Sequence, residues 1–316
     1  MPYQIRVPEY LSPSAIKIFE ADVEDYAVKY LLQKRPPRPP QTQPMAVGSA
    51  FDAYAKSHIY YGLFGNYGPS GQYEKDTIFE AQVEPQNRDF ARDAGGICFA
   101  EYQRRGALAD LMLELQKSIG PPRFEFSIQD KIAWNGFDVP LLGKPDIFFV
   151  NEQGARVIYD WKVNGYCGKY NTSPMKGYVK CRSADGTWSV HKNAMVTPFK
   201  GIPINAMMYL EDGNKEWADQ LSIYSWLLGE QVGSADVVFG IDQITGPGCS
   251  RISSHRLRIK PEWQFRLIER IVQIWKIIQS GHIFQELDRE QSDGKLQLLE
   301  NMHGCERTEL DDILGD

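Results

Sequence analysis

The stretch GKPDIFFVNEQGARVIYDWK, residues 143 to 162, contains two apolar runs on either side of the polar segment NEQGA. Runs rich in β-branched and aromatic residues favour β-strands, and Gly154 supplies a turn signal between them. A short polar loop between two such runs is typical of an antiparallel hairpin. The stretch therefore predicts a β-hairpin with a largely buried body, around which the rest of the chain is organised.

Three charged residues, Asp146, Asp160 and Lys162, interrupt this apolar hairpin. Asp160 and Lys162 are two residues apart on one strand, so both side chains leave the same face, and Asp146 on the partner strand can lie beside them. Two converging carboxylates repel each other unless a cation intervenes, and oxygen ligands suit Mg²⁺ or Mn²⁺. A surface salt bridge between Asp160 and Lys162 explains the same spacing without any chemistry.

Four short motifs follow one another between residues 10 and 230: Ser12-Pro13-Ser14, Val47 to Ala50, Pro145-Asp146 with Asp160-Trp161-Lys162, and Gln220-Leu-Ser-Ile-Tyr224. Together they resemble the signature of the PD-(D/E)XK nuclease superfamily, and GKPD followed by IYDWK is most similar to its RecB-like branch. The resemblance implies an α/β fold with a mixed sheet, a restriction-endonuclease-like αβββαβ core with added helices, and a metal-dependent DNA nuclease. An exonuclease or a nuclease that prefers single strands, of a stand-alone phage type, is the expected form.

The resemblance also implies roles for individual residues. Asp146, Asp160 and the backbone carbonyl of Trp161 would hold the Mg²⁺ or Mn²⁺ ion. Lys162 would be catalytic and not a ligand, since an ammonium group has no lone pair to donate. Gln220 and Tyr224, one helical turn apart, would orient the lysine or the phosphate.

Two further acidic residues are candidates with equally good structural explanations. In RecB-like proteins the helix after Val-Gly-Ser-Ala commonly offers a histidine to the metal, and Asp52 stands at the matching position here. A carboxylate is an acceptable ligand for Mg²⁺, but a solvated helix aspartate explains Asp52 as well. Glu125 is a possible additional acid, and an ion pair with Arg123 or Lys131 explains it equally. No iron–sulfur cluster is expected, because Phe19-Glu20-Ala21-Asp22 stands where some relatives have a cysteine.

After Lys162 the chain carries an insert, residues 163 to 213, before the glutamine helix begins. Lysines and aromatic residues alternate in it, a combination that suits single-stranded nucleic acid because charges follow phosphates and rings stack on bases. A small β-rich subdomain with its own aromatic core is the other interpretation. The predicted nucleic-acid-binding residues are Lys169, Lys176, Lys180, Arg182, Lys192 and Lys200.

Most of the excess negative charge of the chain lies in its last 33 residues. The formal net charge of the 316 residues is −6, but residues 284 to 316 carry ten acidic and three basic residues, so the rest is close to neutral. We expect a nuclease domain over residues 1 to 283 and an acidic, partly disordered tail over residues 284 to 316. A catalytically silent nucleic-acid-binding member of the fold and an acidic interaction protein are the alternative functions.

Several other classes are disfavoured. The chain has no membrane-length apolar run and no signal-peptide core, and its five scattered cysteines fit a reducing cytoplasm. It lacks a GxxxxGK[ST] motif, so an ATP-driven helicase could only be a partner. The expected partners are DNA, possibly single-stranded, and a helicase or recombination protein, without a membrane; the oligomeric state is left open.

The remaining pattern predicts the order of elements. Helices are expected over residues 11–31, 45–63, 87–117 with a break at Gly95-Gly96, 217–229 and 261–280. Residues 64–86 are expected to form a loop. Strands are expected over residues 123–134 and 137–150 with a turn at Asn135-Gly136, as part of a three-stranded meander, and over 237–240 and 251–259, the last as an edge strand.

Overall fold

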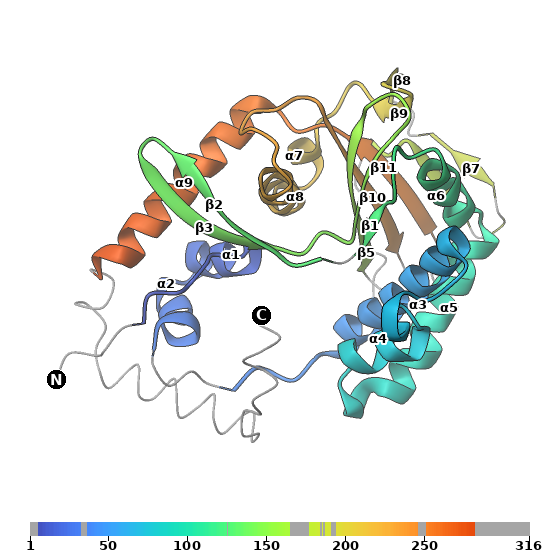
Figure 1. Cartoon of the computed structure of the whole chain (residues 1–316), viewed down its shortest axis with the longest axis horizontal. Helices are drawn as coiled ribbons and strands as arrows, with labels where there is room; N and C mark the ends of the chain where they lie inside the picture. The colour runs from blue at the N-terminus through green and yellow to red at the C-terminus, as the bar shows by residue number, and fades with distance from the viewer. Residues whose placement is uncertain are drawn as a thin grey trace.

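The computed structural model describes residues 6–32, 37–124, 126–164, 177–183, 185, 187–190, 194–245 and 251–281. Within these residues the chain has a mixed α/β fold built on a seven-stranded mixed sheet, with helices on both of its faces (Figure 1). The order of strands is β1-β4-β5-β10-β11-β6-β7. Their bounds are β1 Arg123–Phe124, β4 Ile147–Val150, β5 Arg156–Asn164, β6 Lys180–Arg182, β7 Trp188–Ser189, β10 Val237–Thr245 and β11 Arg251–Leu257.

The predicted hairpin is confirmed at the centre of this sheet. β4 and β5 pair antiparallel, with Ile147 opposite Tyr159, and the turn between them contains Gly154 at φ +78°. On its other edge β5 pairs in parallel with β10 over nine residues. Parallel neighbours need a crossover connection, and α8 (Lys215–Leu227) supplies it on one face of the sheet. A strand in this position is covered on both faces, which is why its residues from Val157 to Trp161 are all buried, the charged Asp160 included.

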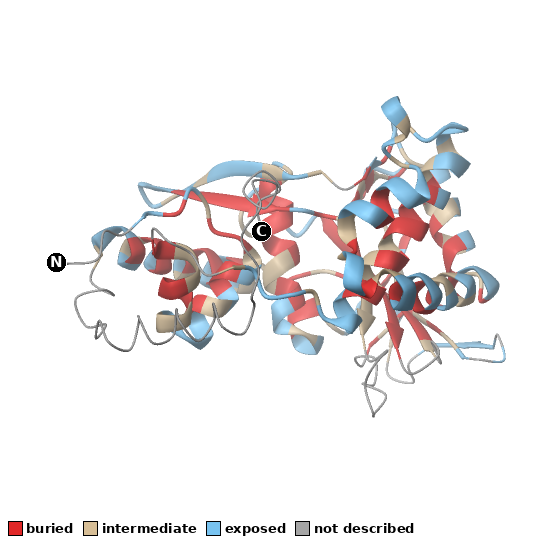
Figure 2. Ribbon diagram, turned by 90° about the horizontal axis from the view of Figure 1, so that it is seen from below, coloured by how far each residue is buried: buried red, intermediate tan, exposed pale blue. Residues whose placement is uncertain are grey.

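Four helices cover the opposite face of the sheet: α3 (Gln43–Phe64), α4 (Lys75–Gln82), α5 (Arg88–Arg104) and α6 (Ala107–Gln116). Apolar side chains of α3, α5 and α6 form one continuous core with the strands, and Figure 2 shows the buried residues on the inner sides of these helices. β5 contributes Val157, Tyr159 and Trp161 to this core. Its alternate residue Ile158 instead joins the core under α8, as the period of two in a strand requires.

A second group of elements packs on the outer side of α8. It consists of α1 (Pro13–Ala21), α2 (Val23–Tyr26), a π-helical turn over Ala27–Leu31, the hairpin of β2 (Ile128–Trp134) and β3 (Phe137–Gly143), and α9 (Pro261–Ser280). The first helix begins as predicted, with the Ser12 hydroxyl accepting from Ala15 N at 3.2 Å and Pro13 in the first turn. Leu11 forms a bridge with Leu141 of β3, so this group is attached to the strand that leads into the central hairpin.

The break expected at Gly95-Gly96 is wrong. α5 runs through both glycines, and the helix ends at Arg104, before Gly106 at φ +79°. A Cβ atom on Gly95 would lie 2.5 Å from Cβ of Ala50 in α3. The glycine is therefore required for close packing of α5 against α3 and not for a kink.

Other element predictions also need correction. The loop expected over residues 64–86 contains α4, and the helix expected over residues 11–31 is interrupted at Asp22. The turn at Asn135-Gly136 is confirmed, but β2 and β3 form a separate two-stranded sheet. The strand expected over residues 137–150 is divided, and its second part, β4, lies in the central sheet beside the short β1. β11 is not an edge strand, because β6 pairs with its free side.

The insert is partly described. Its strands β6 and β7 extend the central sheet, while β8 (Val196–Phe199) and β9 (Ile202–Asn205) form their own hairpin, followed by α7 (Leu210–Gly213). The predicted acidic tail from residue 284 onward lies outside the described residues. Within the described part of the chain, none of the helices has the length and apolar character needed to cross a membrane.

The packing of α5 on α3 gives a first prediction. Gly95→Ala should lower the free energy of unfolding by about 1–3 kcal/mol, because the added methyl group overpacks a backbone contact. The matched variant Gly96→Ala meets only the Tyr54 ring, at 3.7 Å, and should be neutral or stabilise by up to about 1 kcal/mol through helix propensity. Urea unfolding of both variants measures the difference. Equal changes in the free energy of unfolding would show that the close approach of α5 to α3 at Gly95 does not affect stability.

A buried histidine gives a second prediction. His255 on β11 is fully buried, and burial lowers its pKa to about 4, although Asp242 nearby acts in the opposite direction. Between about pH 6.5 and pH 4 the unfolded chain binds a proton that the folded chain excludes. Stability should therefore fall across this window as the pH drops, by up to about 3 kcal/mol, and change little through this residue above pH 6.5.

Thermal unfolding of His255→Gln, compared with wild type from pH 7.5 to pH 4.5, measures this contribution. The melting temperature of the variant should change less with pH than that of wild type, whatever its value at pH 7.5. His58 on α3 is exposed, so His58→Gln is the control and should keep the wild-type slope. A His255→Gln slope that matches wild type would contradict the prediction.

Candidate active site

Strand β5 places the two halves of the candidate site on opposite faces of the sheet. Asp160 and Lys162 share the face covered by α8, and Trp161 between them points into the core under α3. Asp160 is 4% exposed. A carboxylate at this depth is unstable without a partner, so its surroundings decide what the site can do.

Lys162 connects Asp160 to helix α8. Its Nζ atom lies 2.6 Å from Oδ2 of Asp160 and donates to Oε1 of Gln220 at 2.9 Å. Gln220 in turn donates from Nε2 to the hydroxyl of Tyr224 at 2.7 Å. The structure thus brings four of the predicted residues into one chain of contacts, and the solvated surface salt bridge is not what it shows.

Local sequence explains how α8 reaches this position. Asn214 caps the helix by accepting from Trp217 N at 3.0 Å, and the spacing of four residues places Gln220 and Tyr224 on one face. The Tyr224 ring packs against Gly143, where a Cβ atom would lie 2.7 Å from a ring carbon. Burial, together with the carboxylates of Asp160 and Asp146, raises the pKa of Tyr224, so its hydroxyl stays protonated.

Asp146 lies immediately before β4, beside Asp160 in the hairpin register. Its Oδ2 atom accepts from the backbone N–H of Trp161 at 2.9 Å. Because the N–H and C=O of one strand residue face the same edge, the Trp161 carbonyl is also directed toward the edge where Asp146 lies. Burial, then the charges of Asp160 and Asp52, raise the pKa of Asp146 well above its usual range, while Lys56 opposes this shift.

Asp52 reaches the site through a residue that the sequence analysis missed. Nζ of Lys56 lies 2.6 Å from Oδ2 of Asp52 and 3.6 Å from Oδ1 of Asp146. Gln82 of α4 donates to the same Asp52 oxygen at 3.1 Å. Asp52 is therefore not a solvated helix residue. The signal for Lys56 was present, since a lysine four residues after Asp52 interrupts the apolar helix segment AFDAYAKSHI.

The donor set suits a hard cation, with one qualification. Asp146, Asp160 and the Trp161 carbonyl offer only oxygen atoms, and the ammonium group of Lys56 already stands as a cation between two of the acidic residues. Yet among the residues that the structure describes, no three His, Cys, Asp or Glu side chains converge closely enough to form a metal cluster by themselves. The residues fit a metal held by two carboxylates and a carbonyl better than one held by three carboxylates.

Two cavities lie beside this part of β5. One, of about 260 Å³, is lined by Asp52, Lys56 and Asp146, together with Gly48, Ser49, Gln82, Lys144, Trp161 and Val163. The other, of about 550 Å³, lies between α1, α8 and α9 and contains Lys162, Gln220 and Tyr224 in its wall. Lys144 lines both cavities, so it lies where the two cavities adjoin.

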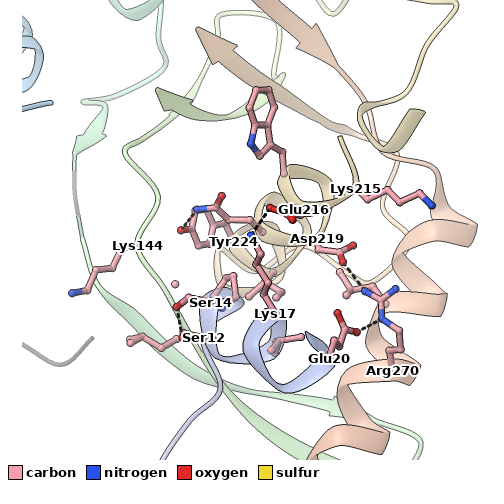
Figure 3. Close-up of a pocket in the computed structure, with 18 of the residues that line it drawn as sticks. Ser12, Ser14, Lys17, Glu20, Lys144, Lys215, Glu216, Asp219, Tyr224 and Arg270 are labelled. Carbon is pink, nitrogen blue, oxygen red and sulfur yellow. Dashed lines mark hydrogen bonds and ion pairs between the residues drawn. The ribbon is translucent and has the colours of Figure 1, made fainter. Parts of the chain in front are cut away.

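The larger cavity is lined by paired charges (Figure 3). Lys17 of α1 contacts Glu216 of α8 at 2.8 Å, and Arg270 of α9 contacts Asp219 at 2.6 Å and Glu20 at 2.8 Å. These pairs tie α1 and α9 to α8 across the cavity. Within these pairs each cation faces a carboxylate, and Lys144, Lys162 and Lys215 add further cations to the lining.

The core side of Trp161 is held by a buried polar network. Its indole Nε1 donates to the hydroxyl of Tyr102 at 3.3 Å, and Tyr102 donates to Asp242 of β10 at 2.5 Å. Arg256 of β11 lies 3.4 Å from Asp242 and 3.4 Å from Glu114 of α6, so the buried carboxylates have a cation. Sequence reasoning missed this network because its members come from four distant segments.

The predicted nucleic-acid-binding residues are only partly described. Lys169, Lys176 and Lys192, as well as the possible acid Glu125, lie outside the described residues. Lys180 and Arg182 both contact Asp110 of α6, at 3.1 Å and 2.7 Å, and Lys200 contacts Asp236 at 3.2 Å. Among the described aromatic residues of the insert, Trp188 is 61% exposed.

The chain was compared with known proteins. No family model matches it, and no curated protein matches it. One solved structure, a proposed exonuclease from Eubacterium rectale, shares 12% identity at a TM-score of 0.43, over 96% of this chain and 92% of that one. Another, SSO0001, shares 11% identity at a TM-score of 0.27, over 73% of this chain and 74% of that one. At TM-scores below 0.5, neither similarity assigns an activity to this chain.

Proposed function

We propose that this chain is a metal-dependent nuclease that hydrolyses DNA phosphodiester bonds, with the RecB-like form of the PD-(D/E)XK site. The observation that carries this proposal is the contact chain from Asp160 through Lys162 to Gln220, adjacent to Asp146 and two cavities. A half-buried lysine held between a buried carboxylate and an amide is costly to maintain for stability alone. Its cost is understandable if the ammonium group acts on a substrate.

The proposed metal ligands are Asp146, Asp160 and the Trp161 carbonyl. A bound Mg²⁺ or Mn²⁺ ion would polarise the phosphodiester and make a water molecule more acidic at neutral pH. The raised pKa of Asp146 supports a cation at this place, since a positive charge would relieve the repulsion from Asp160 and Asp52 that contributes to the shift.

Lys162 would act on the attacking water and on the charge that builds up on the phosphate. Gln220 accepts one of the three ammonium protons and so fixes the direction of the other two. Tyr224 fixes the Gln220 amide by accepting from its Nε2 atom. This division leaves Lys162 free of metal ligation and gives the glutamine helix a positioning function.

The finer assignment is to an exonuclease or a single-strand-preferring nuclease in DNA replication, recombination or repair. The exposed Trp188 on the insert supports a surface on which an unpaired base stacks. The pairing of Lys180 and Arg182 with Asp110 argues that these two side chains contribute less to phosphate binding than the sequence predicted. A helicase or recombination partner remains part of the proposal only through the family resemblance.

Metal dependence is the first test of this function. Cleavage of a labelled oligonucleotide should require Mg²⁺ or Mn²⁺ and stop with EDTA. Asp160→Asn should lose cleavage and bind Mn²⁺ more weakly, because an amide removes an anionic ligand. The exposed Asp138 on β3 provides the control Asp138→Asn, which should cleave like wild type. Full activity in Asp160→Asn would refute the assignment, and DNA binding without cleavage in wild type would favour a catalytically silent binding protein.

The contact chain from Lys162 predicts a graded effect. Lys162→Ala should slow the single-turnover rate by about a hundredfold or more, the order expected for one preorganised electrostatic group. Tyr224→Phe removes one hydrogen bond to Gln220 and should slow it only about three- to tenfold. Lys131 on β2 is exposed, so Lys131→Ala should have no effect. DNA and metal affinity should change little in all three variants.

A different pattern would assign Lys162 another role. If Lys162→Ala abolished DNA binding while the single-turnover rate at saturating DNA stayed intact, the lysine would be a phosphate clamp. If Tyr224→Phe were as slow as Lys162→Ala, the tyrosine would contact the substrate directly rather than position Gln220.

A further inference from the structure

Lys56 is the unexplained charge of the candidate site. Its side chain is 2% exposed, and it projects from the middle of α3 into the cavity that also contains Asp52 and Asp146. A lysine is almost never this deeply buried unless it is paired. Its pairing with one carboxylate from its own helix and another from the start of β4 makes it part of the site, not of the surface.

The position of Lys56 is set by the helix. Asp52 and Lys56 are one turn apart on α3, so any cation that approaches Asp52 competes with an ammonium group held beside it. Displacing the ammonium group would separate a charge that is 2% exposed from both of its carboxylate partners, which costs several kcal/mol. Lys56 is therefore a lasting occupant of this place rather than a side chain that yields to an arriving ion.

The charge balance of the site points in the same direction. Three carboxylates, Asp52, Asp146 and Asp160, face the two buried ammonium groups of Lys56 and Lys162, a formal excess of one negative charge. One divalent ion changes this to one positive charge, which balances a phosphodiester. Two divalent ions would leave three positive charges in a partly buried site. The exposed Lys144 at the same cavity adds a further cation and favours the smaller number of metal ions.

We propose that Lys56 serves as a fixed cation of the active site, so that the site takes a single divalent ion and Asp52 is the counter-ion of Lys56 rather than a metal ligand. This inference rests on the proposed nuclease function. Asp52 then acts as a positioning residue. It holds the ammonium group against Asp146, whose other oxygen is held by Trp161 N, so that Asp146 is oriented from both sides.

The number of bound ions tests this proposal directly. Mn²⁺ binding to the full-length protein, followed by electron paramagnetic resonance of the free ion, should give one ion per wild-type chain. Lys56→Met keeps the apolar part of the side chain and removes the charge. Asp52 and the Asp146 oxygen that faces Lys56 then become available, so a second Mn²⁺ should bind. The exposed Lys117 at the end of α6 provides the control Lys117→Met, which should bind one ion.

A double variant keeps the ion count interpretable if the single variant Lys56→Met is too unstable to fold. Lys56→Met alone leaves Asp52 and Asp146 without this cation and should lower the melting temperature. Asp52→Asn together with Lys56→Met removes both members of the pair, so it should recover much of that loss and return the count to one Mn²⁺ per chain. If the double variant still binds two ions, Asp52 is not the residue that the second ion needs, and the proposal is wrong.

The outcomes separate this inference from the function on which it rests. A wild-type chain that binds two Mn²⁺ ions and cleaves DNA overturns the role of Lys56 and leaves the nuclease assignment standing. A wild-type chain that binds no Mn²⁺ and does not cleave overturns both. The proposal is also overturned if wild type and a folded Lys56→Met variant each bind one Mn²⁺ ion, because the ammonium group of Lys56 then does not exclude a second ion.

Discussion

The energetic cost of buried charge is the constraint on which the rest of this structure depends. β5 lies inside the sheet with helices on both faces, yet it carries Asp160 and Lys162 at its centre. Such charges are tolerated only when each finds a partner. Asp160 and Lys162 pair with each other, and Lys162 also donates to Gln220 of α8. Asp146, immediately before β4, has Lys56 of α3 as its cation. The need to supply them explains why these distant segments meet at one point.

Trp161 links the two faces of the sheet. Its backbone N–H holds Asp146, and its indole donates to Tyr102 in the buried network with Asp242. The orientation of Asp146 is therefore tied to the most deeply packed part of the protein. A carboxylate fixed in this way loses little entropy when it binds a cation, although Asp146 itself lies in the bend just before β4.

Sequence reasoning reached the parts of the structure that depend on local pattern. The hairpin of β4 and β5, the Ser12 cap and the pairing of Gln220 with Tyr224 on one helix face all follow from spacing over a few residues. The errors concern contacts between distant segments. Gly95 looks like a helix breaker until Ala50 is placed against it, and β11 looks like an edge strand until β6 pairs with it. Nothing in the local pattern encodes either neighbour.

The same distinction applies to the candidate site. The resemblance identified Asp146, Asp160 and Lys162, and the structure brings them together around β5. It also identified Asp52, but in the role that a histidine has in relatives. In the structure the carboxylate of Asp52 lies 2.6 Å from the ammonium group of Lys56, one helical turn away. A motif describes which positions face a site, whereas the chemistry at each position depends on neighbours that the motif does not include.

The position of the glutamine helix α8 depends on α7, the last element of the insert. α7 is fixed to the end of β11, because Leu210 N donates to Arg258 O at 2.9 Å and Lys260 contacts Asp212 at 3.0 Å. α8 begins two residues after α7 ends, so these contacts determine where its first turn lies. Gln220 is thus located by the sheet itself. The chain leaves β5 at Asn164 and returns to this anchor at Leu210, so the contacts of α7 with the residues after β11 bring Gln220 beside Lys162.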